Sequence, residues 1–225
     1  MAITRVAQAW GRSNVWLLKV LVGTRVEIRG AERIPRGGLL IASKHQSFLE
    51  TFVLIGCVED PAVILKRELQ WIPIWGWLTV KARMIPVHRG GPYALARMNR
   101  RAAAEAAAGR QIIIFPEGTR RPPGAEPAYR SGIRHLYTSL DKPCLPVALN
   151  SGVFWPRRHW LRRPGTVVIE FLDPIPPGLD RDVFSRRLEE AIETASARLL
   201  SEAEAELAAA GACARPALPR PASLD

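Results

Sequence analysis

Short segments that favour strands recur along this sequence, each bounded by glycine, proline or polar residues, and most of them are apolar and rich in branched residues. They occupy residues 24–30, 37–43, 61–66, 84–87, 110–115, 144–149 and 166–172. Between and after them lie segments with helical patterns, above all residues 92–109, which end at a glycine, and residues 180–210. Strands that alternate with helices predict a layered α/β fold, here a single domain with a central sheet flanked by helices.

The first 22 residues predict a helix with two unlike faces. Its apolar side chains fall near one face, whereas basic residues repeat every seven positions on another. The apolar set is Ile3, Val6, Trp10, Leu17 and Leu21, and the basic set is Arg5, Arg12 and Lys19. Such a helix is suited to a membrane surface. We therefore expect an amphipathic membrane-associating helix at 1–22, a folded domain at 23–210 and a disordered proline-rich tail at 211–225.

The segment IASKHQSFLET, residues 41–51, places a histidine five positions before a carboxylate and directly after an apolar run. On one continuous helix, His45 and Glu50 would point about 140° apart, because each residue advances about 100°. They meet only if the chain turns between them, as at a corner from a strand into a helix. A histidine oriented by a carboxylate is suited to act as a general base. An isolated pair of this kind is more often structural than catalytic, so the rest of the chain has to decide.

Basic and catalytic-type residues follow several other apolar runs. The loop FPEGTRR at 115–121 contains Glu117, Gly118, Thr119 and Arg120, and two further runs end near Lys66 and Arg89. In open α/β sheets, ligands bind beyond the carboxyl ends of the strands. If these strand ends share one edge of the sheet, their side chains form a pocket for an anion, in which the arginine fork suits phosphate. The alternative for the loop is a strand-exit turn with a solvated arginine.

The composition limits the class of partner. The 225 residues carry a formal charge of +11 with a pI near 10.5, which favours nucleic acid, a membrane surface or a phosphorylated substrate. Three widely spaced cysteines, with no CxxC pair, argue against a disulfide framework and a zinc site and fit a reducing compartment. Each apolar run is shorter than the roughly 18 residues of a membrane-spanning helix. We expect no metal.

Four motifs together resemble the glycerolipid acyltransferase family. KHQSFLET, IPVHRG, FPEGTR and LPVALNSG occur here in the order and spacing of that family's four sequence blocks, and the similarity covers about residues 20–175. The resemblance implies transfer of a fatty acyl group from acyl-CoA or acyl carrier protein to the sn-2 hydroxyl of 1-acylglycerol-3-phosphate, which gives phosphatidic acid. It implies no cofactor beyond the acyl carrier. A family member that acylates another lysolipid, such as lyso-ornithine lipid, is the alternative.

The resemblance also implies roles for individual residues. His45 is the general base, and Glu50 accepts a hydrogen bond from its other ring nitrogen. Arg120 lies in the block associated with the acceptor phosphate, in a loop shaped by Glu117, Gly118 and Thr119; Arg89 and Lys66 are weaker phosphate candidates. The chain departs from the family pattern in three respects. It has Glu50 where aspartate is usual and Arg121 where serine is frequent, and it lacks the long hydrophobic N-terminal segment of many relatives.

Tryptophans flanked by basic residues give a second line of argument. Trp10, Trp16, Trp71, Trp75 and Trp77 are the expected membrane contacts, and Trp155 and Trp160 form a third basic-flanked group. Tryptophan beside arginine or lysine suits the headgroup layer of a bilayer. We therefore expect a protein held on the cytoplasmic face of the inner membrane without spanning it. A non-catalytic lipid-binding module or a nucleic-acid-binding module is a more distant alternative, because neither gives His45 and Glu50 a purpose.

Overall fold

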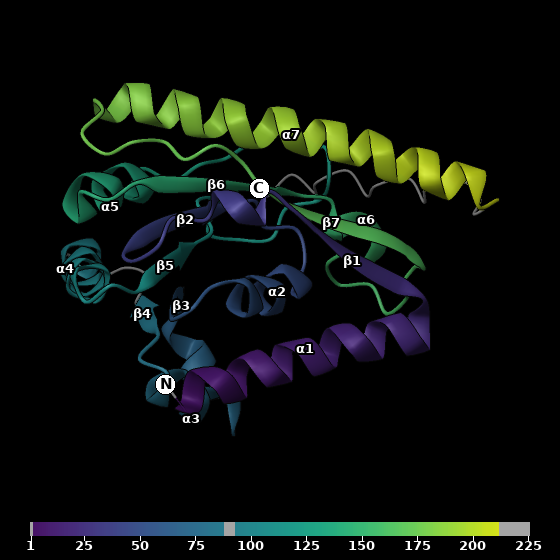
Figure 1. Cartoon of the computed structure of the whole chain (residues 1–225), viewed down its shortest axis with the longest axis horizontal. Helices are drawn as coiled ribbons and strands as arrows, with labels where there is room; N and C mark the ends of the chain where they lie inside the picture. The colour runs from purple at the N-terminus through teal and green to yellow at the C-terminus, as the bar shows by residue number, and fades with distance from the viewer. Residues whose placement is uncertain (1, 88–92, 212–225) are drawn as a thin grey trace, which may run out of the picture.

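The computed structural model describes residues 2–87 and 93–211, and its core is one seven-stranded sheet between layers of helices (Figure 1). The strands are β1 (Thr24–Arg29), β2 (Leu39–Ser43), β3 (Pro61–Lys66), β4 (Ile85–Val87), β5 (Gln111–Ile114), β6 (Cys144–Leu149) and β7 (Gly165–Phe171). The α-helices are α1 (Ala2–Val22), α2 (Leu49–Cys57), α3 (Trp75–Lys81), α4 (Ala94–Ala107), α5 (Gly132–Leu140), α6 (Ser151–Phe154) and α7 (Arg181–Ala209), with 3₁₀ turns at Ala31–Arg33 and Arg67–Trp71. The predicted α/β class is confirmed.

The strand order places the functional loops together. The sheet has the order β1-β7-β6-β2-β5-β3-β4, and every neighbouring pair is parallel except β6 and β7. The five strands from β6 to β4 therefore point the same way. The chain that leaves β2, β5 and β6 emerges at one edge of the sheet, as expected from the sequence for the segment after Ser43 and the loop at 116–121.

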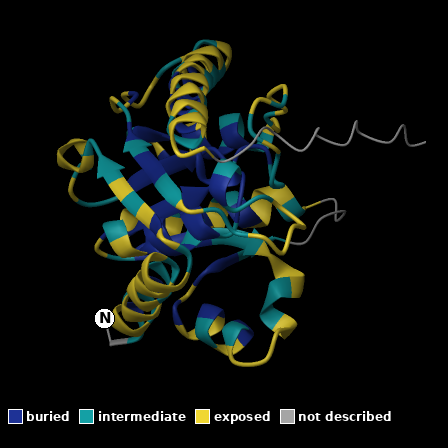
Figure 2. Ribbon diagram, turned by 90° about the vertical axis from the view of Figure 1, so that its right-hand side faces the viewer, coloured by how far each residue is buried: buried dark blue, intermediate teal, exposed yellow. Residues whose placement is uncertain are grey.

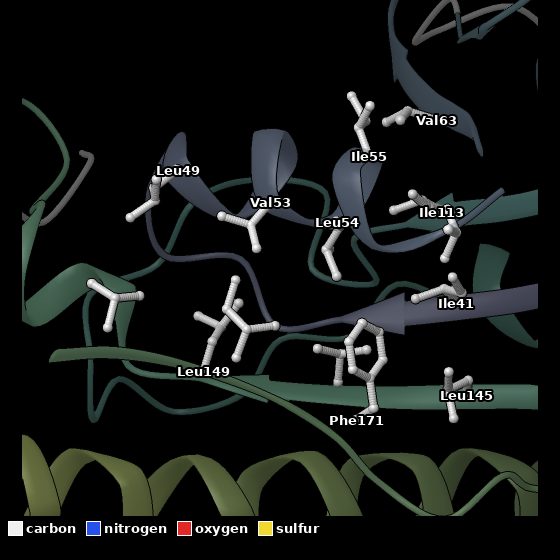
Figure 3. Close-up of a cluster of buried hydrophobic side chains, with 14 of the residues drawn as sticks. Ile41, Leu49, Val53, Leu54, Ile55, Val63, Ile113, Leu145, Leu149 and Phe171 are labelled. Carbon is white, nitrogen blue, oxygen red and sulfur yellow. The ribbon is translucent and has the colours of Figure 1, made fainter. Parts of the chain in front are cut away.

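Alternation along the strands builds two cores, one on each face of the sheet. On β2, Leu39 and Ile41 pack against the layer of α1 and α2, whereas Leu40 and Ala42 face α4, α5 and α7. Figure 3 shows α2 lying over the first face, with Val53 and Leu54 directed toward the strands and Ile55 beside Val63. Buried residues concentrate in the central layer and exposed ones on the outer helices (Figure 2). A sheet covered on both faces explains why its strands are continuous apolar runs.

Helix α1 packs on α2 through small, polar and apolar residues, including an edge-on contact of the Trp10 ring with that of Phe52, whose centroids are 4.5 Å apart. A Cβ at Gly11 would lie 2.9 Å from the backbone oxygen of Phe52, so the two helices approach closely there. Gln8 donates a hydrogen bond to the backbone oxygen of Val58 at 2.8 Å. Of the predicted apolar face, Ile3 packs on the core, but Val6 and Leu21 are exposed. The membrane-surface role of this helix stays a prediction.

Helix α5 was not predicted from the sequence, and most of the predicted tail lies outside the described residues. Helix α5 carries four buried apolar residues, yet it lies between a proline-rich loop and Asp141, so its pattern is too short to stand out in the sequence. The expected tail begins at Gly211, the last described residue before residues 212–225, which lie outside the described residues.

Candidate active site

A turn between β2 and α2 brings the histidine and the carboxylate together. β2 ends at Ser43 and α2 begins at Leu49, so the chain changes direction within the intervening residues. The Nδ1 atom of His45 then lies 2.9 Å from Oε1 of Glu50. This is the corner that the sequence required for the pair to meet. Because an ionised carboxylate only accepts hydrogen bonds, Nδ1 carries the proton and Nε2 is left as the acceptor.

Glu50 is held rigidly in a fully buried position. Its Oε1 atom accepts hydrogen bonds from the backbone N–H groups of Gln46 and Ser47, both at 2.8 Å, in addition to His45. Its Oε2 atom accepts from the hydroxyl of Ser47 at 2.7 Å and of Ser151 at 2.8 Å. Burial opposes ionisation of Glu50, but the hydrogen bond and charge of His45 and the bonds from Ser47 outweigh it, so its pKa lies below the usual value.

The segment after β6 completes this arrangement, and its contribution was missed in the sequence. Ser151 begins α6, and the N–H of Gly152 donates to the side-chain oxygen of Gln46 at 3.0 Å. A Cβ at Gly152 would lie 2.9 Å from Gln46 Cβ, so only glycine allows this approach. The available signal was the motif LPVALNSG, which places a hydroxyl and a glycine directly after a buried strand. Its partner Glu50 is 101 residues away in sequence, and no local pattern specifies that contact.

The imidazole of His45 faces a cavity. Its ring stacks on Phe115 with centroids 4.0 Å apart, and its side chain is 17% exposed. The backbone oxygen of His45 accepts a hydrogen bond from the N–H of Arg121 at 2.8 Å, which ties the β2–α2 corner to the loop after β5. Stacking on one side and Glu50 behind the ring leave Nε2 as the nitrogen available to a ligand.

The loop after β5 contributes both to the cavity and to the interior. Gly118 takes a left-handed backbone conformation with φ of 64°, and Gly118, Thr119 and Arg120 line the same cavity as His45. The side chain of Glu117 points elsewhere and is buried: its Oε1 atom lies 3.2 Å from Nζ of Lys44. Glu117 thus fixes the loop through its contact with the buried Lys44 and is not among the residues that line the cavity.

Lys44 is the centre of a buried ion network beneath the site. Its side chain is 2% exposed, and its ammonium group lies 2.8 Å from Glu193 on α7 and 3.2 Å from Glu117. The hydroxyl of Tyr129 donates to Glu193 at 2.8 Å. Burial raises the pKa of Glu117, against the lowering effect of the nearby charge of Lys44. This network joins the residue before His45, the loop after β5 and helix α7.

The cavity has a volume of about 690 Å³, and its walls are both apolar and basic. The apolar lining comes from α2, β3, α3 and α4 and includes Ile55, Val63 and Met98. The basic lining residues are Lys66, Arg120, Arg130 and Arg157. Arg89, the remaining phosphate candidate, lies outside the described residues. A cavity that combines apolar and cationic walls suits an anionic amphiphile.

Neither a nucleophilic thiol nor a metal cluster is found in the described part of the chain. Burial raises the pKa of Cys57 to about 11 and that of the fully buried Cys144 further, so both thiols are protonated at neutral pH. Residues 2–87 and 93–211 contain no cluster of three histidine, cysteine, aspartate or glutamate side chains placed to hold a metal ion. Cys213 lies outside these residues.

The tryptophans fall into two groups. Trp16, Trp71 and Trp77 are 61%, 73% and 59% exposed, as a membrane contact requires. Trp10 and Trp75 form the second group: their rings lie 5.0 Å apart, and both line the cavity. Within the described residues, every helix is too short or too polar to cross a bilayer.

The fold and the site together present a His–Glu pair at the edge of an α/β sheet, open to a cavity that arginines help to line, an arrangement suited to general-base chemistry. Comparison with known proteins gives the family. The family model described as Acyltransferase matches residues 25–150, and the chain belongs to this family.

Individual relatives support this assignment. The chain is 39% identical over 165 residues to the 1-acyl-sn-glycerol-3-phosphate acyltransferase of Pseudomonas aeruginosa, an alignment that covers 73% of this chain and 64% of that protein. The coconut (Cocos nucifera) enzyme of the same name is 29% identical, with 73% and 53% covered. The chain therefore spans less than two thirds of the length of these relatives. A lyso-ornithine lipid O-acyltransferase of P. aeruginosa is 27% identical, with 80% of this chain and 76% of that protein covered.

A solved structure shows the same fold. The crystal structure of the 1-acyl-sn-glycerophosphate (LPA) acyltransferase from Thermotoga maritima superposes with a TM-score of 0.73 and 25% sequence identity. The match covers 87% of this chain and 79% of the other. The similarity thus extends beyond residues 25–150 to most of the helices and strands described above.

Proposed function

We propose that this protein transfers a fatty acyl group from a thioester carrier to the sn-2 hydroxyl of 1-acylglycerol-3-phosphate, giving phosphatidic acid for phospholipid synthesis. The single observation that carries the proposal is the composition of the cavity. His45, oriented by Glu50, lines it together with Arg120, and much of the remaining wall is apolar. An acceptor with a hydroxyl, a phosphate and an acyl chain matches these three features. Relatives named for this reaction support the choice of acceptor.

The proton transfer follows from the geometry of the pair. Nε2 of His45 accepts the proton of the acceptor hydroxyl while the oxygen attacks the thioester carbonyl. Glu50 keeps Nδ1 protonated and stabilises the imidazolium that forms, as the orienting carboxylate does in serine hydrolases. When the tetrahedral intermediate collapses, the C–S bond breaks and the thiolate takes the proton from His45. The ester, the free thiol and neutral imidazole result, so atoms and charges balance.

Direct transfer fits the absence of an activated thiol in the described residues. A thioester is already activated, and an oriented hydroxyl with a base is sufficient for its acylation. Cys57 and Cys144 have raised pKa values, which makes them poor acyl acceptors. The donor is acyl-CoA or acyl carrier protein, and the reaction requires neither a metal nor a cofactor.

The acceptor lies in a bilayer, and the exposed apolar residues beside the cavity indicate how the protein reaches it. Trp71, Ile74 and Trp77 are 73%, 78% and 59% exposed on and around α3, whose Trp75 lines the cavity. Ile74 has a positive φ of 66°, a strained conformation for a β-branched residue that presents an apolar side chain to the outside. We place the protein on the cytoplasmic face of the inner membrane, with this segment and α1 in the headgroup layer.

The test is an acyl-transfer assay with defined substrates. Purified protein is offered 1-acylglycerol-3-phosphate, lyso-ornithine lipid or monoacylglycerol, each with acyl-CoA or with acyl carrier protein as donor, and the product is identified by mass. We expect phosphatidic acid from the wild type and none from His45→Ala. Product only with lyso-ornithine lipid would show that the acceptor is wrong. Equal turnover by His45→Ala would refute the mechanism.

A further inference from the structure

Arg157 lies outside the four family motifs, yet it is part of the same cavity. It follows α6 in the chain, and its Nη1 atom donates to the backbone oxygen of Arg120 at 3.0 Å and to the hydroxyl of Thr119 at 3.4 Å. All three residues line the cavity together with His45. The side chain thus reaches from the β6–β7 connection to the loop after β5, at the part of the cavity where the acceptor phosphate is expected.

Within residues 2–87 and 93–211, the charge of Arg157 has no counter-ion. Among the residues that the structure describes, the ion pairs involve other arginines, and none joins a carboxylate to Arg120, Arg130 or Arg157. Desolvation, with the positive charges of Arg158 and Arg120, lowers the pKa of Arg157. Like charges in one cavity repel, and a dianion between them removes that repulsion and supplies the missing partner.

We propose that Arg157 binds the phosphate monoester of the acceptor together with Arg120, so that two guanidinium groups from two different loops hold it. This inference rests on the proposed function and adds a residue to its acceptor site. A phosphate monoester carries close to two negative charges at neutral pH and offers three acceptor oxygens, enough for both arginine forks. The contact of Arg157 with the backbone of Arg120 sets the spacing between the two groups before the ligand arrives.

The phosphate groups of the acyl donor are a second source of the same chemistry. The two sources differ in which substrate depends on Arg157. If the acceptor phosphate is bound, the KM for 1-acylglycerol-3-phosphate rises and the KM for the donor does not. If a donor phosphate is bound, the donor's KM rises instead.

The neighbouring Arg158 provides a matched control. It stands in the same turn and has a positive φ of 63°, but it does not line the cavity. Arg157→Ala and Arg158→Ala each remove one positive charge from one turn, so effects on overall charge and on attachment to anionic vesicles are equal. Arg157→Lys keeps the charge but removes the planar fork.

The experiment measures kcat and KM for both substrates in mixed micelles, with monoacylglycerol as an acceptor that lacks phosphate. For Arg157→Ala we expect the KM for 1-acylglycerol-3-phosphate to rise by about tenfold or more, because a charge-assisted fork is lost. Arg157→Lys should recover part of this loss and Arg158→Ala should behave as wild type. The preference of the enzyme for the phosphorylated acceptor over monoacylglycerol should fall by the same factor in Arg157→Ala.

Three results would overturn the inference. They are an unchanged KM in Arg157→Ala, a rise confined to the acyl donor, and an equal loss of kcat with both acceptors, which would indicate a structural role in holding the loop. Each of these requires an active wild-type enzyme. A wild type that is inactive with every acceptor would instead refute the proposed function, so the two failures are distinguishable.

Discussion

Replacing Lys44 by methionine should destabilise the protein far more than an ordinary lysine substitution. The ammonium group is 2% exposed and lies within 3.2 Å of Glu117 and 2.8 Å of Glu193. Removing one partner of a buried ion pair costs about 3–5 kcal/mol, because the opposite charge is left buried and uncompensated. Glu193 is 26% exposed and regains water easily, so most of the cost falls on Glu117, which is 1% exposed and keeps, among the described residues, only the guanidinium of Arg121, 3.7 Å away.

The pH dependence of the stability loss in Lys44→Met should identify Glu117 as the source of that cost. Burial already raises its pKa in the folded protein, and the charge of Lys44 opposes the rise. Without Lys44, the folded-state pKa rises further above the unfolded value of about 4.3. Because the folded state of the variant then holds its proton to higher pH, the variant loses stability relative to wild type as the pH increases. We expect the difference in unfolding free energy to be larger at pH 8 than at pH 5.

The assay is reversible urea unfolding followed by tryptophan fluorescence at constant ionic strength, from pH 5 to pH 8. Lys81→Met, at an exposed position on α3, is the control and should cost no more than about 0.5 kcal/mol. Lys44→Met/Glu117→Gln should recover part of the stability, because the stranded carboxylate is gone. A loss in Lys44→Met equal to that in Lys81→Met, or one that is independent of pH, would show that the network is not held by charge.

Three further predictions concern the site and its surroundings. His45→Ala should abolish acyl transfer in a protein that still folds, and Glu50→Gln should reduce kcat severely, since loss of the orienting carboxylate costs about 10⁴ in serine proteases; near-normal kcat in either would contradict the base assignment. Ser151→Ala removes a hydrogen bond to the buried charge of Glu50 and should lower stability by about 1.5–3 kcal/mol in urea unfolding, with the exposed Lys81→Met as the comparison; no loss would mean that Ser47 alone satisfies Oε2. Trp71→Ala/Trp77→Ala should weaken co-sedimentation with anionic vesicles, and the loss should be larger at high salt because screening removes the electrostatic part of the binding. Trp160→Ala, at an exposed position away from α3, is the control. Undiminished binding by the double variant would show that this segment does not contact the membrane.

The strands were predicted well from the sequence because most of them are buried on both faces. A short, continuous apolar run between polar turns is compatible with few structures other than a buried strand. It also predicted that His45 and Glu50 meet, since both lie within one short segment whose turn is a local matter. The contacts of Ser151 with Glu50 and of Lys44 with Glu193 were out of reach. Each joins residues about 100 or more positions apart, and such pairs depend on strand order and helix placement rather than on any local pattern.

The orientation of Trp75 and Glu117 shows the same limit at the level of single side chains. Basic neighbours indicated a surface position for the whole tryptophan group, but α3 is one helix with two faces, and Trp75 lies on the inner one. The acidic residue of FPEGTR was grouped with its loop, whereas its side chain turns inward to Lys44. The residue types in a segment indicate whether it lies near the surface, but the direction of each side chain depends on how the segment packs in the folded protein.

The corner between β2 and α2 has a consequence for how this family diversifies. The proposed base His45 and its carboxylate Glu50 lie five residues apart on a single segment, whereas the cavity's arginines come from loops that follow other strands. Insertions or substitutions in those loops can change the accepted headgroup and leave proton transfer untouched. This separation between proton transfer and headgroup binding agrees with the comparisons. Relatives named for two different lysolipid acceptors both align to most of this chain.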